Sequence, residues 1–146
     1  MDAKEEAFHA LCCYTLAHGS PSFIHQHVVD AFGAQDSREG DKSIRLTFAL
    51  VGLYLHVERG WTGRQVQLAH MKLVRRKHQW PTFRIPDDRG AINAATVLAV
   101  SPGSERDQMI DAWCRSVWRA FSEHRAKIEK LLSEHGVAPV PEAPGR

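Results

Sequence analysis

The stretch that decides the fold reads Leu46-Thr47-Phe48-Ala49-Leu50-Val51-Gly52-Leu53-Tyr54-Leu55-His56-Val57. Only Thr47, Gly52 and His56 interrupt its apolar residues. Because a helix that is apolar on nearly every side has to be buried, this stretch predicts the central helix of a helical domain. We expect this helix to begin at residue 41 or 43 and to end at 59, before Gly60.

Capping residues mark further helices on both sides of this stretch. Asp2, Ser20, Thr62 and Ser104 are all suited to the N-cap position, and each precedes a segment of helical apolar periodicity. The predicted helices cover residues 2–17, 20–35, 62–80 and 104–135, with a short one near 94–100. The fold class is therefore all-α.

Prolines separate the last predicted helices and follow the final one. Residues 79–103 contain three prolines together with Asp87, Asp88 and Gly90, which predicts a long ordered loop. Residues 137–146 contain another three prolines and are predicted to be a disordered tail. We therefore expect one helical domain over residues 1–136, built as a bundle of four to five helices with one long proline-containing loop.

Length and composition place the chain among ordinary globular proteins. Its 146 residues are enough for one domain with a substantial core. No apolar run could span a bilayer and the first residues do not resemble a signal peptide, so we expect a cytoplasmic protein without membrane contact. Cys12, Cys13 and Cys114 form no disulfide framework and no Cys-x-x-Cys pair.

The chemically richest segment reads Phe23-Ile24-His25-Gln26-His27-Val28-Val29-Asp30. Polar groups on a half-buried surface are costly unless a neighbour, a metal or a ligand satisfies them. His25 and His27 lie about 200° apart on a helix, so one regular helix cannot direct both at the same ion. His27 and Asp30 are three residues apart and share a face.

These residues indicate a site for a divalent metal or a small ligand, with an enzymatic role as one option. Imidazole and carboxylate groups from facing helices suit zinc, iron or manganese. No familiar metal motif such as His-Glu-x-x-His is present, and a buried network that only holds helices together remains the alternative. The candidate metal ligands are His25, His27, Asp30 and His70, with His18, Gln35 and His56 as supporting residues.

A basic segment gives a second functional hypothesis. Residues 59–86 contain seven Lys or Arg residues and no acidic residue. This segment could bind an anionic partner, either an acidic protein or single-stranded nucleic acid. Nucleic acid is the less favoured of the two because the net charge is only +2. A homodimer is also compatible with the sequence. The candidate contact residues are Arg64, Lys72, Arg75, Arg76, Lys77 and Arg84.

The chain also resembles a family of uncharacterised bacterial proteins. The resemblance rests on the His25-x4-Asp30-x4-Gln35 pattern and extends to Gly52-Leu53, Glu58-x-Gly60 and Ala69-His70-Met71, covering roughly residues 11–120. The resemblance implies the helical fold and the importance of the polar segment 23–30, but it implies no activity. Some members carry an N-terminal pair of zinc-type cysteines, which this chain lacks, so no metal role for those cysteines carries over.

Overall fold

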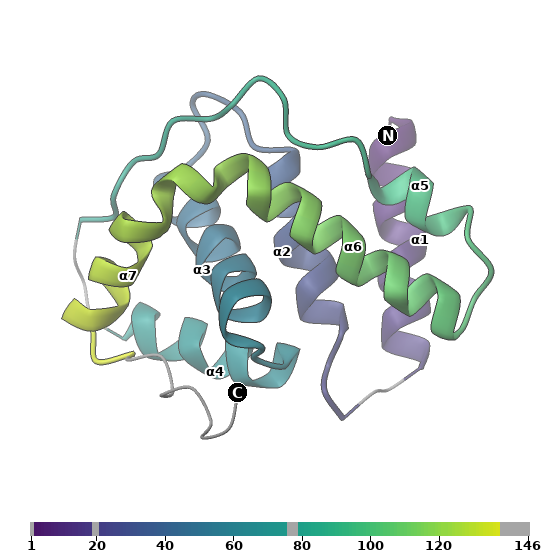
Figure 1. The fold of residues 1–146 in the computed structure, drawn as a ribbon, viewed down its shortest axis with the longest axis horizontal. Coiled ribbons are helices and arrows are strands. Elements are labelled where there is room, and N and C mark those ends of the chain that lie inside the picture. Colours follow the sequence, from purple (N-terminus) through teal and green to yellow (C-terminus); the bar gives the residue numbers. More distant parts are fainter. Residues whose placement is uncertain (1, 19–20, 76–78, 138–146) are drawn as a thin grey trace.

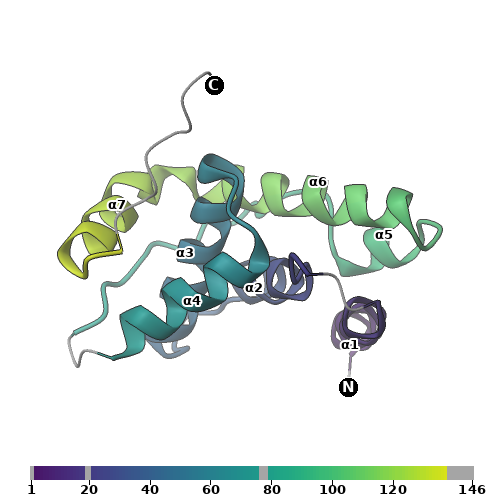
Figure 2. The ribbon, with the colours of Figure 1, turned by 90° about the horizontal axis from the view of Figure 1, so that it is seen from below.

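The computed structural model describes residues 2–18, 21–75 and 79–137. Every regular element within these residues is helical, which confirms the all-α prediction. No helix in this part of the chain is long and apolar enough to cross a membrane. The helices lie in two layers in Figure 2, with α1, α2 and α4 below, α6 and α7 above, and α3 between them.

The central helix is α3, Ser43–Arg59 (Figure 1). It ends at Arg59, as the sequence predicts, and the next residue, Gly60, has a left-handed φ of 70°. It packs on α2, α4, α6 and α7. The side chains that place it in the core belong to Leu46, Ala49, Leu50, Val51, Leu53, Tyr54 and Leu55.

The first two helices are α1, Ala3–Ala17, and α2, His25–Gln35. Asp2 caps α1 by accepting a hydrogen bond from the backbone N–H of Glu5. α2 begins later than predicted, because Phe23 has a φ of 60° and cannot be part of a right-handed helix. The predicted cap, Ser20, lies outside the described residues.

The Phe23 backbone lies against the start of α4, Gly63–Val74. A Cβ atom added to Gly63 would come within 1.8 Å of the Phe23 carbonyl oxygen, so only glycine allows this approach. Thr62 caps α4 as predicted, and together with Gln65 it forms a capping box. α4 ends at Val74, earlier than predicted, and residues 76–78 lie outside the described part of the chain.

The expected long loop runs over one edge of the bundle in Figure 1 to the short helix α5, Ala94–Leu98. Gln35 at the end of α2 holds it in place. The Gln35 amide nitrogen donates to the carbonyl oxygens of Arg89 at 3.3 Å and Ile92 at 2.7 Å. Its oxygen accepts from Trp113 Nε1 on α6 at 2.9 Å, so one side chain joins three parts of the fold.

The predicted final helix is divided in two. α6, Ser104–Phe121, is followed by a 3₁₀ turn, Ser122–His124, and by α7, Arg125–Glu134. The Ser122 hydroxyl donates to the Arg119 carbonyl oxygen, and the His124 ring donates to the Arg84 carbonyl oxygen at 2.8 Å. The bend lets α7 fold back onto α3 (Figure 1). Val137 is buried, and the rest of the predicted tail lies outside the described residues.

Candidate functional site

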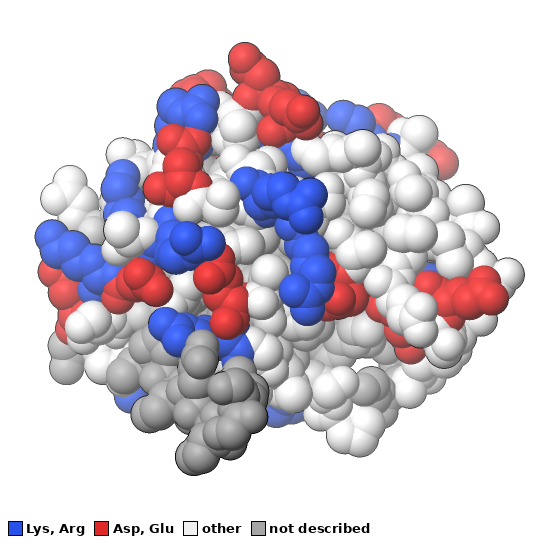
Figure 3. All heavy atoms as spheres, viewed as in Figure 1, with Lys and Arg blue, Asp and Glu red and all other residues white. Residues whose placement is uncertain are grey.

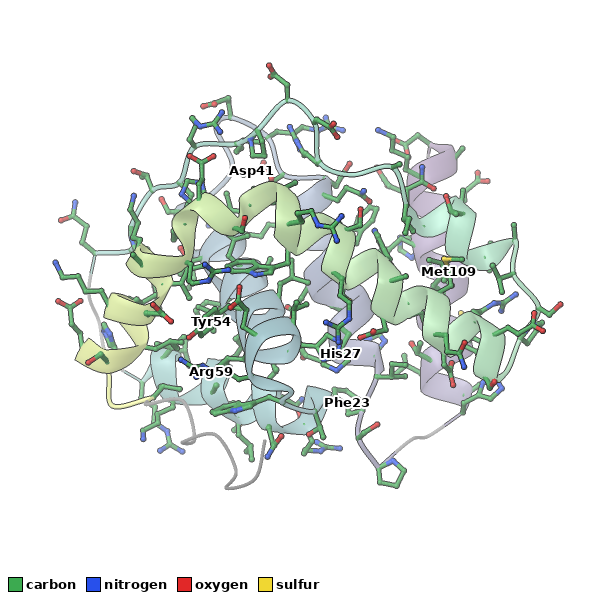
Figure 4. All side chains as sticks on the ribbon, viewed as in Figure 1. Phe23, His27, Asp41, Tyr54, Arg59 and Met109 are labelled. Carbon is green, nitrogen blue, oxygen red and sulfur yellow. The ribbon has the colours of Figure 1, made fainter. Side chains whose placement is uncertain are left out.

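A polar cluster lies where α2, α3 and α6 meet. Its centre is His27, whose side chain is almost fully buried (Figure 4). The His27 ring stacks on the ring of His56 from α3, with centroids 3.7 Å apart and planes 23° apart. α2 and α3 run antiparallel, so Asp30, one turn beyond His27, meets Gly52, one turn before His56.

His56 is held from both sides. Its Nε2 donates to Asp111 Oδ1 at 2.8 Å, and its Nδ1 lies 3.3 Å from the carbonyl oxygen of Trp61. The second oxygen of Asp111 accepts from Arg115 Nε at 2.8 Å. Burial tends to raise the pKa of Asp111, but Arg115 and His56 outweigh it and lower that pKa. His56 is therefore fixed beside a carboxylate.

Asp30 lies against the backbone of Gly52. A Cβ atom at residue 52 would be 1.8 Å from Asp30 Oδ2, so the carboxyl group occupies the space that glycine leaves. Oδ1 accepts from Gln26 Nε2 at 3.1 Å, whereas Oδ2 is buried and has no hydrogen-bond partner among the described residues. Burial raises the pKa of Asp30 well above its usual value, so the carboxyl group tends to stay protonated.

The ring of His27 is also without a hydrogen bond to any described residue. Burial, followed by the neighbouring His56, lowers the pKa of His27 to about 3, against the opposing effect of Asp111. The ring is therefore neutral at physiological pH, and at least one nitrogen offers a lone pair. His27 and Asp30 thus present two unpartnered groups on the same face of α2.

Cys114 of α6 borders the cluster on a third side. Its thiol donates weakly to the carbonyl oxygen of His27, with sulfur and oxygen 3.6 Å apart. Burial raises the pKa of Cys114 well above its usual value, and the nearby Asp30 and Asp111 raise it further. The thiol stays protonated and is a poor nucleophile.

The structure places three other predicted histidines elsewhere. His25 Nδ1 lies 2.9 Å from the Thr15 hydroxyl of α1, on the other side of α2 from His27. His18 Nδ1 donates to the carbonyl oxygen of Tyr14 at 2.6 Å.

His70 Nε2 donates to the carbonyl oxygen of Phe48 at 2.8 Å, and the two rings stack. Phe48 precedes His56 by eight residues, which is about 12 Å along α3. His70 therefore contacts α3 at a different level from His27. Of the seven residues proposed from the sequence, His27, Asp30 and His56 come together.

Gln35 contributes to a separate feature at the other end of α2. A surface cavity of about 500 Å³ opens there between the start of α1, the end of α2 and the loop before α5. The Gln35 amide nitrogen already donates to the loop, and its oxygen already accepts from Trp113 on α6. Gln35 therefore serves to join these parts of the fold. Residues that line the cavity include Lys4, Phe32, Arg38, Asp87 and Asn93.

Sequence reasoning missed Asp111 and Cys114 as members of the cluster. Cys114 falls on the apolar face of the last predicted helix, where a buried cysteine is ordinary and indicates no site. Asp111 follows Ile110 at the border of that face and precedes Arg115 by one turn. A carboxylate at the edge of an apolar stripe was the available signal, but it did not identify His56 as the partner.

The cluster does not form a complete metal site. Within the described residues, no group of three or more His, Cys, Asp or Glu side chains is placed to hold an ion. Among the residues that the structure describes, the His27 ring and Asp30 Oδ2 have no hydrogen-bond partner, whereas His56 and Asp111 are hydrogen-bonded to each other. An ion or ligand would therefore take two groups from the protein and its remaining contacts from elsewhere.

The basic residues are spread over several environments. Arg64 lies over the Phe23 ring, Lys72 donates to the Gly136 carbonyl oxygen, and Arg84 pairs with Glu123. Arg75 is exposed, while Arg76 and Lys77 lie outside the described residues. Figure 3 shows basic and acidic side chains side by side over α7 and the end of α3, so this face carries no single-sign patch.

Comparison with known families places the chain in one of them. A family model for DUF5946, a family of unknown function, matches residues 5–122. The chain belongs to this family. No curated protein and no solved structure shows a significant match.

The DUF5946 match covers the whole polar cluster. It begins in α1 and ends at Ser122, where α6 gives way to the 3₁₀ turn. α2, α3 and α6, which carry the cluster, are inside the matched region, and α7 is outside it. The site and its supporting helices are thus part of the family domain.

Proposed function

We propose that this DUF5946 protein binds a small ligand at the polar cluster, and that a divalent metal ion such as zinc, iron or manganese is the first candidate. The observation that carries the proposal is Asp30 Oδ2, which is buried without a hydrogen-bond partner among the described residues and shares a face of α2 with the largely buried His27. Each buried polar group without a partner costs about 1–3 kcal/mol. A bound ion or ligand would provide the missing partner.

The two groups suit a metal in their chemistry. A neutral imidazole is the form that binds metals, and burial keeps His27 in that form. Asp30 has to lose its proton before it can bind an ion, so metal binding would release a proton and become tighter as the pH rises. His56 would support His27 by stacking behind it.

The same pair could also act in acid–base chemistry on a small substrate. A protonated Asp30 can donate a proton, and a neutral His27 can accept one. The enzymatic form of the proposal therefore uses the same residues without a metal.

The test is equilibrium dialysis of tag-free protein against Zn²⁺, Fe²⁺ or Mn²⁺, followed by elemental analysis. We expect about one ion per chain, with weaker binding at pH 6 than at pH 8. His27→Gln and Asp30→Asn should each lose the ion. His25→Gln is the matched control, because His25 faces α1 instead, and it should keep the ion.

Folding of every variant is checked by circular dichroism. Wild-type protein that stays metal-free, or equal loss of metal in all three variants, would rule out a metal at His27 and Asp30. Retention of metal in the His27 variant with loss in the His25 variant would move the site to the other side of α2.

A second candidate function is the binding of an anionic partner through the basic segment 59–86. The observation that favours it is the exposure of Arg64 and Lys72 on α4 and of Arg75 directly after it. Replacement of Arg75 and Arg76 by Ala should weaken such binding, and added salt should weaken it steeply. For both candidate functions we propose a cytoplasmic location, and both are compatible with a homodimer.

A further inference from the structure

α4 has two different faces. Toward α2 and α3 it buries Val66, Ala69 and Leu73. Away from them it exposes Leu68 at 57%, Met71 at 50% and Val74 at 56% of their surfaces. Figure 2 shows α4 at the edge of the lower layer.

Leu68 and Met71 do not lie at the margin of the core stripe, whereas Val74 lies about 100° from Leu73, on the flank between the two faces. At 100° per residue, Leu68 and Met71 lie within about 40° of the direction opposite to Leu73. Arg64 and Arg75 lie on the same line, one turn before Leu68 and one turn after Met71. We call this surface, made of Arg64, Leu68, Met71, Val74 and Arg75, the outer face of α4.

The positive charge of the outer face indicates what kind of partner it can bind. Residues 59–86 contain no acidic residue, so the arginines at its two ends have no carboxylate on their own helix. Arg64 lies over the Phe23 ring and donates to Gln67, a neutral group. Two copies of α4 packed face to face would bring arginines together, which disfavours a second copy of this chain.

We propose that the outer face of α4 docks an acidic amphipathic helix of another protein. Such a helix would place apolar side chains from positions i, i+3 and i+7 on Leu68, Met71 and Val74. Its carboxylates would lie near Arg64 and Arg75 and add long-range attraction. This inference rests on the second candidate function and specifies the partner for it.

The experiment uses a fluorescein-labelled synthetic peptide of Leu and Glu with apolar residues at i, i+3 and i+7. A second peptide has the same composition in scrambled order. Fluorescence anisotropy with the full chain should show binding of the first peptide and at least ~10-fold weaker binding of the second, a difference of about 1.4 kcal/mol. The affinity should fall as salt is added.

Two matched variants locate the contact. Leu68→Ser should weaken binding of the amphipathic peptide by ~10-fold or more, since it removes an apolar contact in the middle of the outer face. Leu16→Ser is the control, because Leu16 is 58% exposed but lies on α1. It should bind the peptide like the wild type.

The remaining outcomes separate this inference from the broader function. If both peptides bind equally, and Arg64→Ser weakens both while Leu68→Ser weakens neither, the docking inference is wrong and anionic binding stands. If neither peptide binds, the docking inference is wrong, and the broader function is wrong as well when an oligo-dT strand also fails to bind. Tighter binding of an oligo-dT strand, or self-association that Leu68→Ser abolishes, would also overturn the acidic-helix partner.

Discussion

At the scale of single residues, burial shifts the pKa values of histidines and of an aspartic acid in opposite directions. It lowers the pKa of His27 to about 3 and of His70 to about 4, and it raises the pKa of Asp30. In each case the neutral form is favoured. Between about pH 4 and pH 6.5, the folded protein therefore holds these side chains neutral where the unfolded chain would carry charges.

His70 allows a test of this effect away from the polar cluster. Its folded pKa of about 4 is below the ordinary value of 6.5, so the unfolded state binds more protons between these pH values. The stability that this provides is present above pH 6.5 and is lost as the pH falls toward 4. Between pH 7 and pH 4, the free energy of unfolding should fall by roughly 3 kcal/mol less in His70→Gln than in the wild type.

Urea denaturation of chelator-treated protein at pH 4, 5.5 and 7 measures this difference. His9→Gln, on the exposed side of α1, is the control and should follow the wild type. Parallel curves for wild type and His70→Gln would contradict a buried neutral ring at this position.

At the scale of elements, the α2–α3 contact depends on two glycines that play different roles. A Cβ atom on Gly33 would meet Ala49 Cβ at 3.4 Å, an ordinary contact. A Cβ atom on Gly52 would overlap the Asp30 carboxyl group at 1.8 Å. Gly33 is not required for packing, whereas Gly52 leaves the space that the Asp30 carboxyl group occupies.

Alanine at these two positions should therefore affect the free energy of unfolding differently. Alanine normally favours a helix over glycine by about 1 kcal/mol, so Gly33→Ala should leave stability unchanged or raise it by up to that amount. Gly52→Ala should lower it by about 1–3 kcal/mol, because the added methyl overlaps Asp30. Both are measured by urea denaturation at pH 7.

A double variant, Asp30→Ala with Gly52→Ala, identifies the cause. Removal of the carboxyl group should make the Gly52→Ala substitution less destabilising than it is in the wild-type background. Equal effects in both backgrounds would place the cause somewhere other than Asp30.

Element boundaries were predictable where their cause is local. The end of α3 before Gly60 and the cap at Thr62 depend on a few neighbouring residues, and both predictions are confirmed. The break at Ser122 was not predicted, because His124 is held by the carbonyl oxygen of Arg84, which is 40 residues away. The late start of α2 likewise depends on how Phe23 meets Gly63.

At the scale of the whole molecule, the cluster was only partly predictable. The face shared by His27 and Asp30 follows from helical geometry within one element. The pairing of His56 with Asp111 joins residues 55 positions apart, and it depends on how α6 crosses α3. A single sequence contains no signal for that crossing, so Asp111 was left out and His70 was included.

Gln35 offers a test of how the parts are joined. Gln35→Leu would remove its bond to Trp113 Nε1 and leave the Arg89 and Ile92 carbonyl oxygens without their donor. We expect a loss of about 2–4 kcal/mol in the free energy of unfolding, since Trp113 Nε1 and two part-buried carbonyl oxygens lose their partner together.

Hydrogen exchange shows where this loss acts. In Gln35→Leu, amides of residues 89–93 should exchange faster, while those in the middle of α3 should change only in line with global stability. Unchanged exchange at 89–93 would mean that other contacts, such as Arg89 to the end of α2, are sufficient to hold the loop.

The contact of α6 with His27 and His56 has a consequence for the order of events as the chain is made. The first half of the cluster, on α2 and α3, is synthesised before Asp111 and Cys114 exist. Until α6 leaves the ribosome, His27 and Asp30 face water on that side. The polar cluster is therefore completed only once α6 has been made and packs against α2 and α3.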